Sequence, residues 1–148
     1  MIEGASGLNP IDFKSVRQFA VQFVYQQDIN QQLFLHESTL NNFILQSQIP
    51  ENQRNFLKSF LEKIFKSIQE VDALIEKNTT NWKISRIAKV DLAILRVGVV
   101  ELLERLETDV PVIISEAATI AQEFGSANSP SFVNGILASI AKEVRKKV

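Results

Sequence analysis

The sequence predicts an all-α protein with about seven helices in two packed helical bundles. Its apolar residues recur at intervals of three and four, which is the spacing of one face of a helix. No run of strand length alternates between apolar and polar residues. One stretch, Val90 to Glu104, is apolar on nearly every side, yet it is too short and too often charged to span a membrane. It therefore predicts a central helix that its neighbours bury on several sides.

Composition and charge narrow the classes of function. The chain has 148 residues, of which 45% are hydrophobic, enough for one domain with a sizeable core. It has no cysteine and one histidine, His36, so thiolate sites are excluded and no metal or cofactor is expected. The 16 basic and 17 acidic residues give a net charge of −1, so any RNA site has to be a local patch. Without the basic start and apolar run of a signal peptide, we expect a cytoplasmic protein with no membrane partner.

The predicted domain organisation is simple. Residues 1–9 are small and polar without a period and predict a flexible tail. A single all-helical domain follows over residues 10–148. The polar turn at residues 78–81 divides it into an N-terminal bundle at about residues 10–78 and a C-terminal bundle at about residues 82–147.

The first helix is expected from Pro10 to about Asp28. Lys14, Arg17 and Gln18 lie off its apolar stripe, so they can face solvent or a ligand. Further helices are expected from His36 or Ser38 to Gln46, over Glu51 to Lys77 as one long helix, in a short turn between Trp82 and Lys89, over Val90 to Glu104, from Pro111 to Phe124, and after Ser129.

Two glycines suggest specific roles near the end of the chain. Gly125 follows Phe124 and is predicted to end its helix in the left-handed conformation. Ser129 and Pro130 are typical of the cap and first residue of the last helix. Gly135, inside that helix, predicts the close approach of another helix.

Several charged residues interrupt or follow the central helix. Asp91 has a structural role, through the helix dipole at the N-terminal turn or an internal pair with an arginine such as Arg86, or it offers its carboxylate to a basic partner. Arg96 is expected to have a structural carboxylate partner, and Glu101 with Arg105 forms an ordinary exposed pair. A C-terminal basic cluster either offsets a helix dipole or binds RNA, and it comprises Lys142, Arg145, Lys146 and Lys147.

Four segments together resemble the NusB family of bacterial transcription antitermination factors. They are VRQFAVQFVYQQD near the start, then VDLAILRVGVVELL, DVPVIISEAATIAQEFG and SFVNGIL in the second half. Their order and spacing agree over residues 12 to 144, while the middle helices match in character alone. The resemblance implies an all-helical fold of two bundles.

The resemblance also implies a function. It implies binding to the boxA element of nascent ribosomal RNA, with the ribosomal small-subunit protein NusE, in the antitermination complex of RNA polymerase. A homodimer is compatible with it. The implied RNA-binding residues are Lys14, Arg17, Gln18, Tyr25, Asn128, Ser131 and Phe132, and the implied partner-binding residue is Asp91.

The chain departs from the family pattern in ways that bear on these roles. Its first helix offers Lys14 and Arg17 where the family usually has several adjacent arginines, and Val100 replaces a frequent aromatic residue. Tyr25 and Phe132 can equally pack against the core, and Asn128 is a good turn residue with or without RNA.

Three hypotheses follow from these residues. The first is an RNA-binding antitermination factor, and the second is a helical protein-interaction adaptor that does not bind RNA. The third is an RNA-modifying enzyme, since NusB-like domains also occur fused to RNA methyltransferases. The chain has no second domain, glycine-rich phosphate loop or nucleophile elbow, so we predict that it is not an enzyme.

Overall fold

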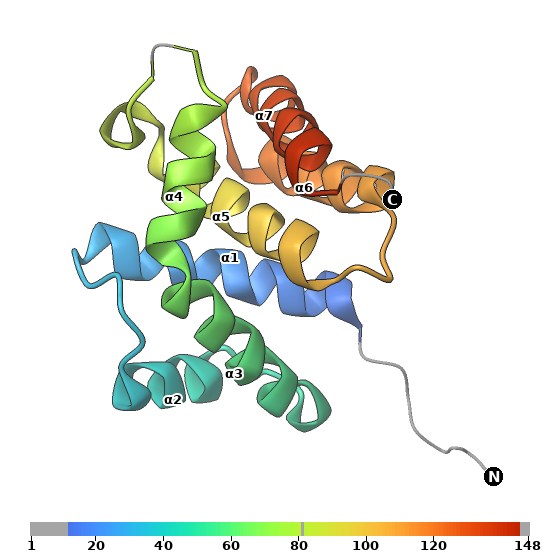
Figure 1. Cartoon of the computed structure of the whole chain (residues 1–148). Coiled ribbons are helices and arrows are strands. Elements are labelled where there is room, and N and C mark those ends of the chain that lie inside the picture. Colours follow the sequence, from blue (N-terminus) through green and yellow to red (C-terminus); the bar gives the residue numbers. More distant parts are fainter. Residues whose placement is uncertain (1–11, 81, 146–148) are drawn as a thin grey trace, which may run out of the picture.

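The computed structural model describes residues 12–80 and 82–145, and within them it contains helices but no strand (Figure 1). This confirms the all-α fold class. The flexible tail predicted for residues 1–9 and the helix start at Pro10 lie outside the described residues. The elements are α1 (Phe13–Ile29), α2 (Glu37–Gln46), α3 (Glu51–Lys66), α4 (Ile68–Lys77), a 3-10 turn η1 (Ile84–Arg86), α5 (Lys89–Glu104), α6 (Val110–Phe124) and α7 (Ser129–Val144).

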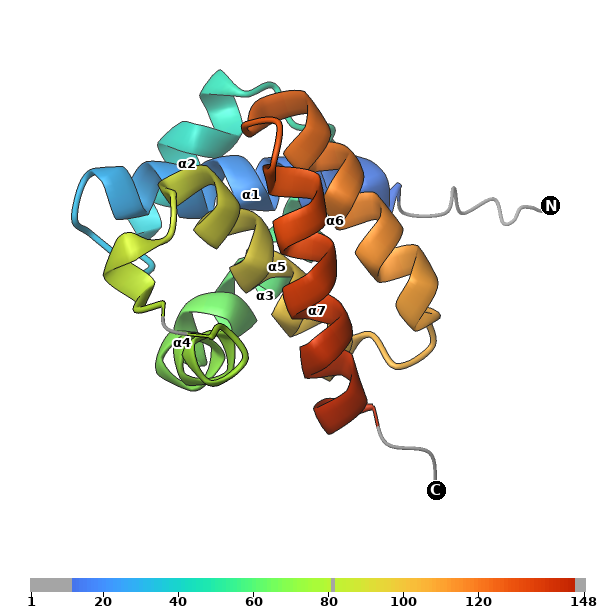
Figure 2. The same cartoon turned by 90° about the horizontal axis from the view of Figure 1, so that it is seen from above.

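Helix α5 is the centre of the molecule, as its composition predicts. It packs against α1, α3, α4, α6 and α7, and Figure 2 shows it between α4 on one side and α6 and α7 on the other. Every residue from Asp91 to Leu102 is buried. The three charged residues in that stretch are Asp91, Arg96 and Glu101. Each is removed from water, and a buried charge is costly unless another group inside the protein pairs with it.

The long helix predicted over residues 51–77 is in fact two helices, which meet at Ser67. The Ser67 hydroxyl donates a hydrogen bond to the carbonyl oxygen of Lys63 at 2.6 Å, and its backbone leaves the helical region at φ −107° and ψ 16°. Serine competes in this way for carbonyls that would otherwise serve the helix. The apolar stripe continues across the break, with Ile64 and Val71 both buried, so its spacing gave no sign of it.

Glycines mark close packing, though not where the sequence suggested. Gly125 ends α6 as predicted, but with φ −97° and ψ −167°, which is not the left-handed conformation. A Cβ on Gly125 would lie 2.5 Å from the Ser129 Oγ, so space and not backbone angle requires glycine there. Gly135 has no atom within 4 Å of its would-be Cβ, so the expected close approach is absent. It occurs instead at Gly98 of α5, where a Cβ would lie 2.9 Å from Leu137 Cδ1 of α7.

Arg96, a buried charged residue of α5, joins α1 and α4 to the central helix. The Arg96 guanidinium donates to Asp72 of α4 at 2.8 Å through two nitrogens and to Asp28 of α1 at 3.1 Å. Lys89 also binds Asp28, at 2.9 Å, which places the start of α5 beside the end of α1. The structural role predicted for Arg96 is confirmed.

Candidate nucleic-acid interface

A shallow groove of about 200 Å³ runs between α1, the start of α5 and the end of α6. Its rim includes two aromatic rings, Tyr25 and Phe124, which are 37% and 56% exposed. Such exposure is costly for large rings in water, so the groove is a candidate contact surface. The residues that line it are Gln18, Val21, Gln22, Tyr25, Val90, Ile120 and Phe124.

One face of α1 carries several of the predicted RNA-binding residues. Lys14, Gln18, Gln22 and Tyr25 follow one another at intervals of four, four and three, so they form a row along the helix. Lys14 is exposed and takes part in no ion pair within residues 12–80 and 82–145. Gln18 is half-buried and lies in the groove. This row therefore brings together a cation, amides and an aromatic ring.

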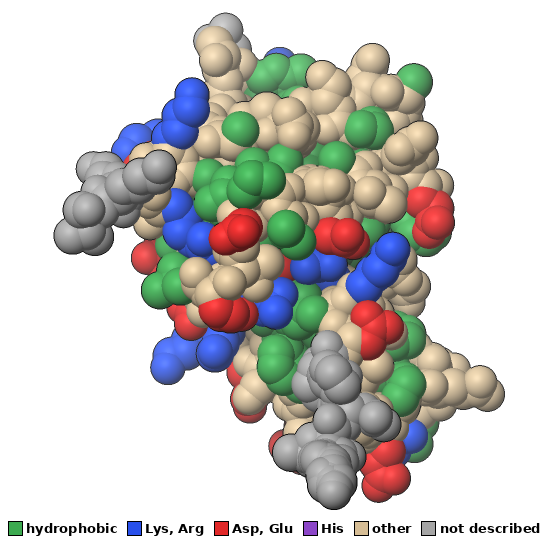
Figure 3. Space-filling model, turned by 90° about the vertical axis from the view of Figure 1, so that its right-hand side faces the viewer, with side chains coloured by type: hydrophobic (Ala, Val, Ile, Leu, Met, Phe, Trp, Pro, Cys, Tyr) green, Lys and Arg blue, Asp and Glu red, His purple; other side chains and the backbone are tan. Residues whose placement is uncertain are grey.

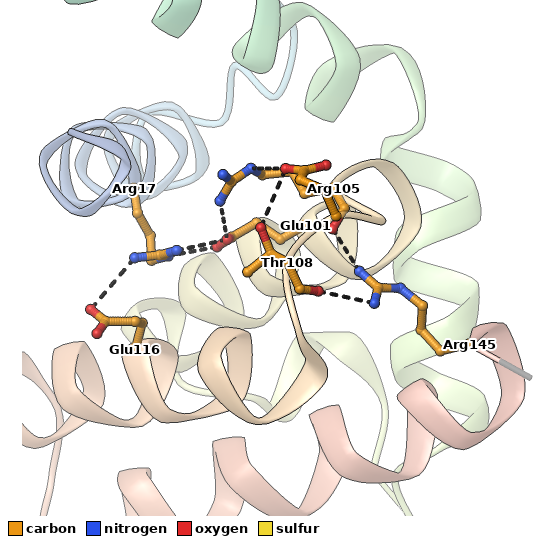
Figure 4. Close-up of polar contacts among 7 residues, drawn as sticks. Arg17, Glu101, Arg105, Thr108, Glu116 and Arg145 are labelled. Carbon is orange, nitrogen blue, oxygen red and sulfur yellow. Dashed lines mark hydrogen bonds and ion pairs between the residues drawn. The ribbon is translucent and has the colours of Figure 1, made fainter. Parts of the chain in front are cut away.

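Arg17 does not belong to this row, and the expectation that it faces solvent or a ligand is wrong. It is 4% exposed and points inward between α5 and α6 (Figure 4). Its Nε and Nη2 donate to the two carboxylate oxygens of Glu101 at 2.7 and 2.8 Å, and its Nη1 lies 3.5 Å from Glu116. The guanidinium is thus occupied within the protein.

The ion pair of Arg17 belongs to a larger network at the end of α5 (Figure 4). Glu101 is fully buried, so its predicted exposed pairing with Arg105 is wrong as to exposure, although Arg105 Nη1 does lie 3.5 Å from it. The Arg105 guanidinium also covers the ring of Phe13, at 3.5 Å from the centroid. Nearby, a backbone hydrogen bond lowers the pKa of the exposed Glu107 carboxyl, and the charge of Arg105 acts in the same direction.

Arg145 shows what part of the C-terminal basic cluster does. Its guanidinium donates to three main-chain carbonyl oxygens, those of Leu102 at 2.6 Å, Arg105 at 2.8 Å and Thr108 at 3.1 Å. These include carbonyls that the end of α5 leaves without helical partners. Lys142 is exposed, while Lys146 and Lys147 lie outside the described residues.

The connection from α6 to α7 presents the second set of predicted RNA-binding residues. Asn128 and Ser131 are exposed, and Asn128 takes the cap position of α7 without a side-chain capping bond. Phe132 is half-buried against the core. Its ring centroid lies 6.0 Å from that of Trp82, a residue that the sequence analysis did not single out as functional.

Asp91 lies in the first turn of α5, next to the groove residue Val90. It is 8% exposed, and its Oδ1 accepts no hydrogen bond from any described residue. Arg86, the proposed internal partner, is exposed and takes part in no ion pair within the described part of the chain. The carboxylate is therefore nearly buried with one oxygen unsatisfied.

On the face drawn in Figure 3, the surface charge fits a local site better than a broad one. Figure 3 shows Lys and Arg side chains next to Asp and Glu across the middle of one face, without a large area of either sign. The described residues contain no cluster suited to a metal ion and no helix long and apolar enough to cross a membrane. A row of amides with exposed rings and few cations suits unpaired bases better than a duplex backbone.

Comparisons with known proteins agree with the fold. The NusB family matches residues 14–142. The transcription antitermination protein NusB of Acetivibrio thermocellus is 36% identical over 87% of this chain and 88% of its own length. The protein of the same name from Borreliella burgdorferi is 35% identical over 90% of this chain and 96% of its own.

Solved structures also agree with the fold. T. maritima NusB superposes with a TM-score of 0.79 at 28% identity, over 88% of this chain and 90% of that one. A chain from the crystal structure of the antitermination factors NusB and NusE in complex with dsRNA superposes with a TM-score of 0.74. At 24% identity, over 88% of this chain and 96% of that one, the second likeness shows the fold alone.

Proposed function

Because this chain belongs to the NusB family of transcription antitermination proteins, we propose that it binds boxA-type RNA of nascent ribosomal RNA together with the ribosomal protein NusE. In this role it would join the antitermination complex of RNA polymerase. The family consists of RNA-binding factors and not of enzymes.

The observation that best supports RNA binding is the row on α1 beside the apolar groove. Lys14 can meet a phosphate, Gln18 can bond a base edge, and the exposed ring of Tyr25 can stack on a base. Stacking of one base on an aromatic ring contributes about 1–3 kcal/mol. Asn128, Ser131 and Phe132 would contribute a second contact at the start of α7.

The burial of Arg17 changes the expected strength of binding. Each phosphate neutralised on a single strand adds about 0.7 to the slope of log affinity against log salt concentration. With Arg17 occupied by Glu101, Lys14 is the remaining cation of α1. The free protein should therefore bind RNA weakly, and a basic partner would supply the further phosphate contacts.

Asp91 is the residue that we assign to the partner. Its unsatisfied Oδ1 would gain a hydrogen bond or ion pair from a basic side chain of NusE. Within the described residues, nothing else offers it that bond, so partner binding would relieve a cost of the free protein.

The test is the binding of a fluorescently labelled boxA-type RNA, followed by anisotropy, with and without NusE. We expect weak binding by the free protein and much tighter binding when NusE is present. Tyr25→Ala should weaken binding, whereas Phe56→Ala on α3, which removes a ring of nearly equal exposure (38% against 37%), should not. No RNA binding in either condition would favour the adaptor hypothesis, which the burial of Arg17 also favours.

A further inference from the structure

Trp82 is the single tryptophan of the sequence, and it lies exposed between α4 and η1. Its side chain is 48% exposed, while its ring contacts Phe132 at a centroid distance of 6.0 Å and an angle of 54° between planes. The indole therefore has one aromatic neighbour, and much of the side chain is open to solvent.

Hydrogen bonds hold the backbone at Trp82 and Ile84. The buried Thr79 hydroxyl lies 2.9 Å from the Trp82 carbonyl oxygen and 3.0 Å from that of Glu76, so it can donate to either. Two residues after Trp82, the backbone N–H of Ile84 donates to Glu76 Oε2 at 2.9 Å. These bonds tie the Trp82 carbonyl and the Ile84 amide to the end of α4 and the turn after it, so less backbone freedom is left to lose when the ring binds a ligand.

Two cations follow Trp82 closely in the chain. Lys83 and Arg86 are both exposed, and neither takes part in an ion pair within the described residues. The nearby carboxylate of Glu76 is engaged by the backbone of Ile84. An exposed aromatic ring flanked by free cations is the pattern by which proteins hold single-stranded nucleic acid.

The position of Trp82 continues the α7 surface. Asn128 and Phe132 are four residues apart, so they share one face of the first turn of α7, and the Trp82 ring lies against Phe132. We propose that Trp82 is an RNA-stacking residue that takes one unpaired base, while Lys83 and Arg86 hold the adjoining phosphates. This inference rests on the proposed function and adds to it a binding site on the connection between α4 and α5.

Two measurements on the same samples test it. The complex with NusE is titrated with labelled boxA-type RNA, and both the anisotropy of the RNA and the tryptophan emission are recorded. A Trp82→Phe chain serves as the blank for any emission from NusE. We expect the Trp82 emission to change in step with the anisotropy, since a base stacked on the indole alters its surroundings.

Variants give the size of the effect. Trp82→Leu keeps an apolar side chain against Phe132 but removes the stacking surface, and it should weaken RNA binding about 5- to 150-fold. Trp82→Phe should retain most of the affinity, and Phe56→Ala should leave it unchanged. Removing both cations, in Lys83→Ala with Arg86→Ala, should lower the salt slope by about 1.4.

The outcomes separate this inference from the proposed function. Suppose that RNA binds, that the Trp82 emission of the unmodified chain does not change, and that Trp82→Leu binds RNA as tightly as the unmodified chain. The stacking role is then overturned and the proposed function stands. If Trp82→Leu weakens NusE binding in the absence of RNA, the surface is a protein contact and the inference is likewise overturned. If RNA binds in no condition, the proposed function fails, and the stacking role fails with it.

Discussion

Arg17 of α1 and Glu101 of α5 form a bidentate ion pair, with hydrogen bonds of 2.7 and 2.8 Å. The Arg17 side chain is 5% exposed and the Glu101 side chain 0%. The pair joins the helix that carries the proposed RNA row to the centre of the core. It also explains why a cation that looks available in the sequence is not available in the structure.

Arg17→Ala should destabilise the protein by about 3–5 kcal/mol, because it leaves the buried Glu101 carboxylate without its main partner. The measurement is chemical denaturation followed by circular dichroism. The combined variant Arg17→Met with Glu101→Leu should lose less stability than Arg17→Ala, since apolar residues of similar size remove both charges. Equal losses in the two would show that charge burial is not the cause.

Lys14→Ala should lower the salt slope of RNA binding by about 0.7 and leave the melting temperature unchanged, because Lys14 is exposed and unpaired in the described structure. Lys66→Ala on α3 removes another exposed lysine away from the α1 row and serves as the control. Salt titrations of RNA binding, with NusE present, provide the comparison. An unchanged slope in Lys14→Ala would remove Lys14 from the interface.

Gly98→Ala should destabilise the fold by about 1–3 kcal/mol through overpacking. Its new Cβ would lie 2.9 Å from Leu137 Cδ1, and Leu137 is fully buried and cannot move aside easily. Gly135→Ala is the matched control, because its Cβ would meet nothing within 4 Å. That change should instead stabilise α7 by about 0.5–1 kcal/mol, and thermal melting of both variants gives the comparison.

Asp91→Asn should weaken the complex with NusE and change the free energy of unfolding by no more than about 1 kcal/mol, the size of a helix-dipole effect. The reason is that its Oδ1 has no hydrogen-bond partner to lose within the described residues. Asp72→Asn is the contrasting variant, since Asp72 accepts two hydrogen bonds from Arg96 and should lose stability. Chemical denaturation measures the stability of both variants, and a pull-down with NusE measures their binding. A loss of about 3 kcal/mol in Asp91→Asn would mark it as structural.

The sequence was sufficient for the fold class because helical periodicity is a local signal. The buried character of α5, and the need of Arg96 for a carboxylate partner, were both expected from the neighbouring residues, although the partners Asp28 and Asp72 were not. The break at Ser67 was missed because one residue of irregular backbone does not disturb the apolar spacing on either side.

The candidate site was less predictable because its decisive contacts join distant parts of the chain. Glu101 lies 84 positions after Arg17, so no local pattern could show that Arg17 turns inward. Trp82 was missed for the same reason, since Phe132 supports it from another helix. A single tryptophan after a polar turn was the one signal that could have drawn notice to it.

The distance along the chain between Arg17 and Glu101 has a consequence for synthesis on the ribosome. At about 5–20 residues per second, the 84 intervening steps take roughly 4–17 s. Throughout that interval the nascent chain carries Arg17 without Glu101, and for much of it Asp28 without Arg96. Helix α1 is thus made first but cannot complete its packing until α5 has emerged. The α1 row therefore reaches its final position late in synthesis.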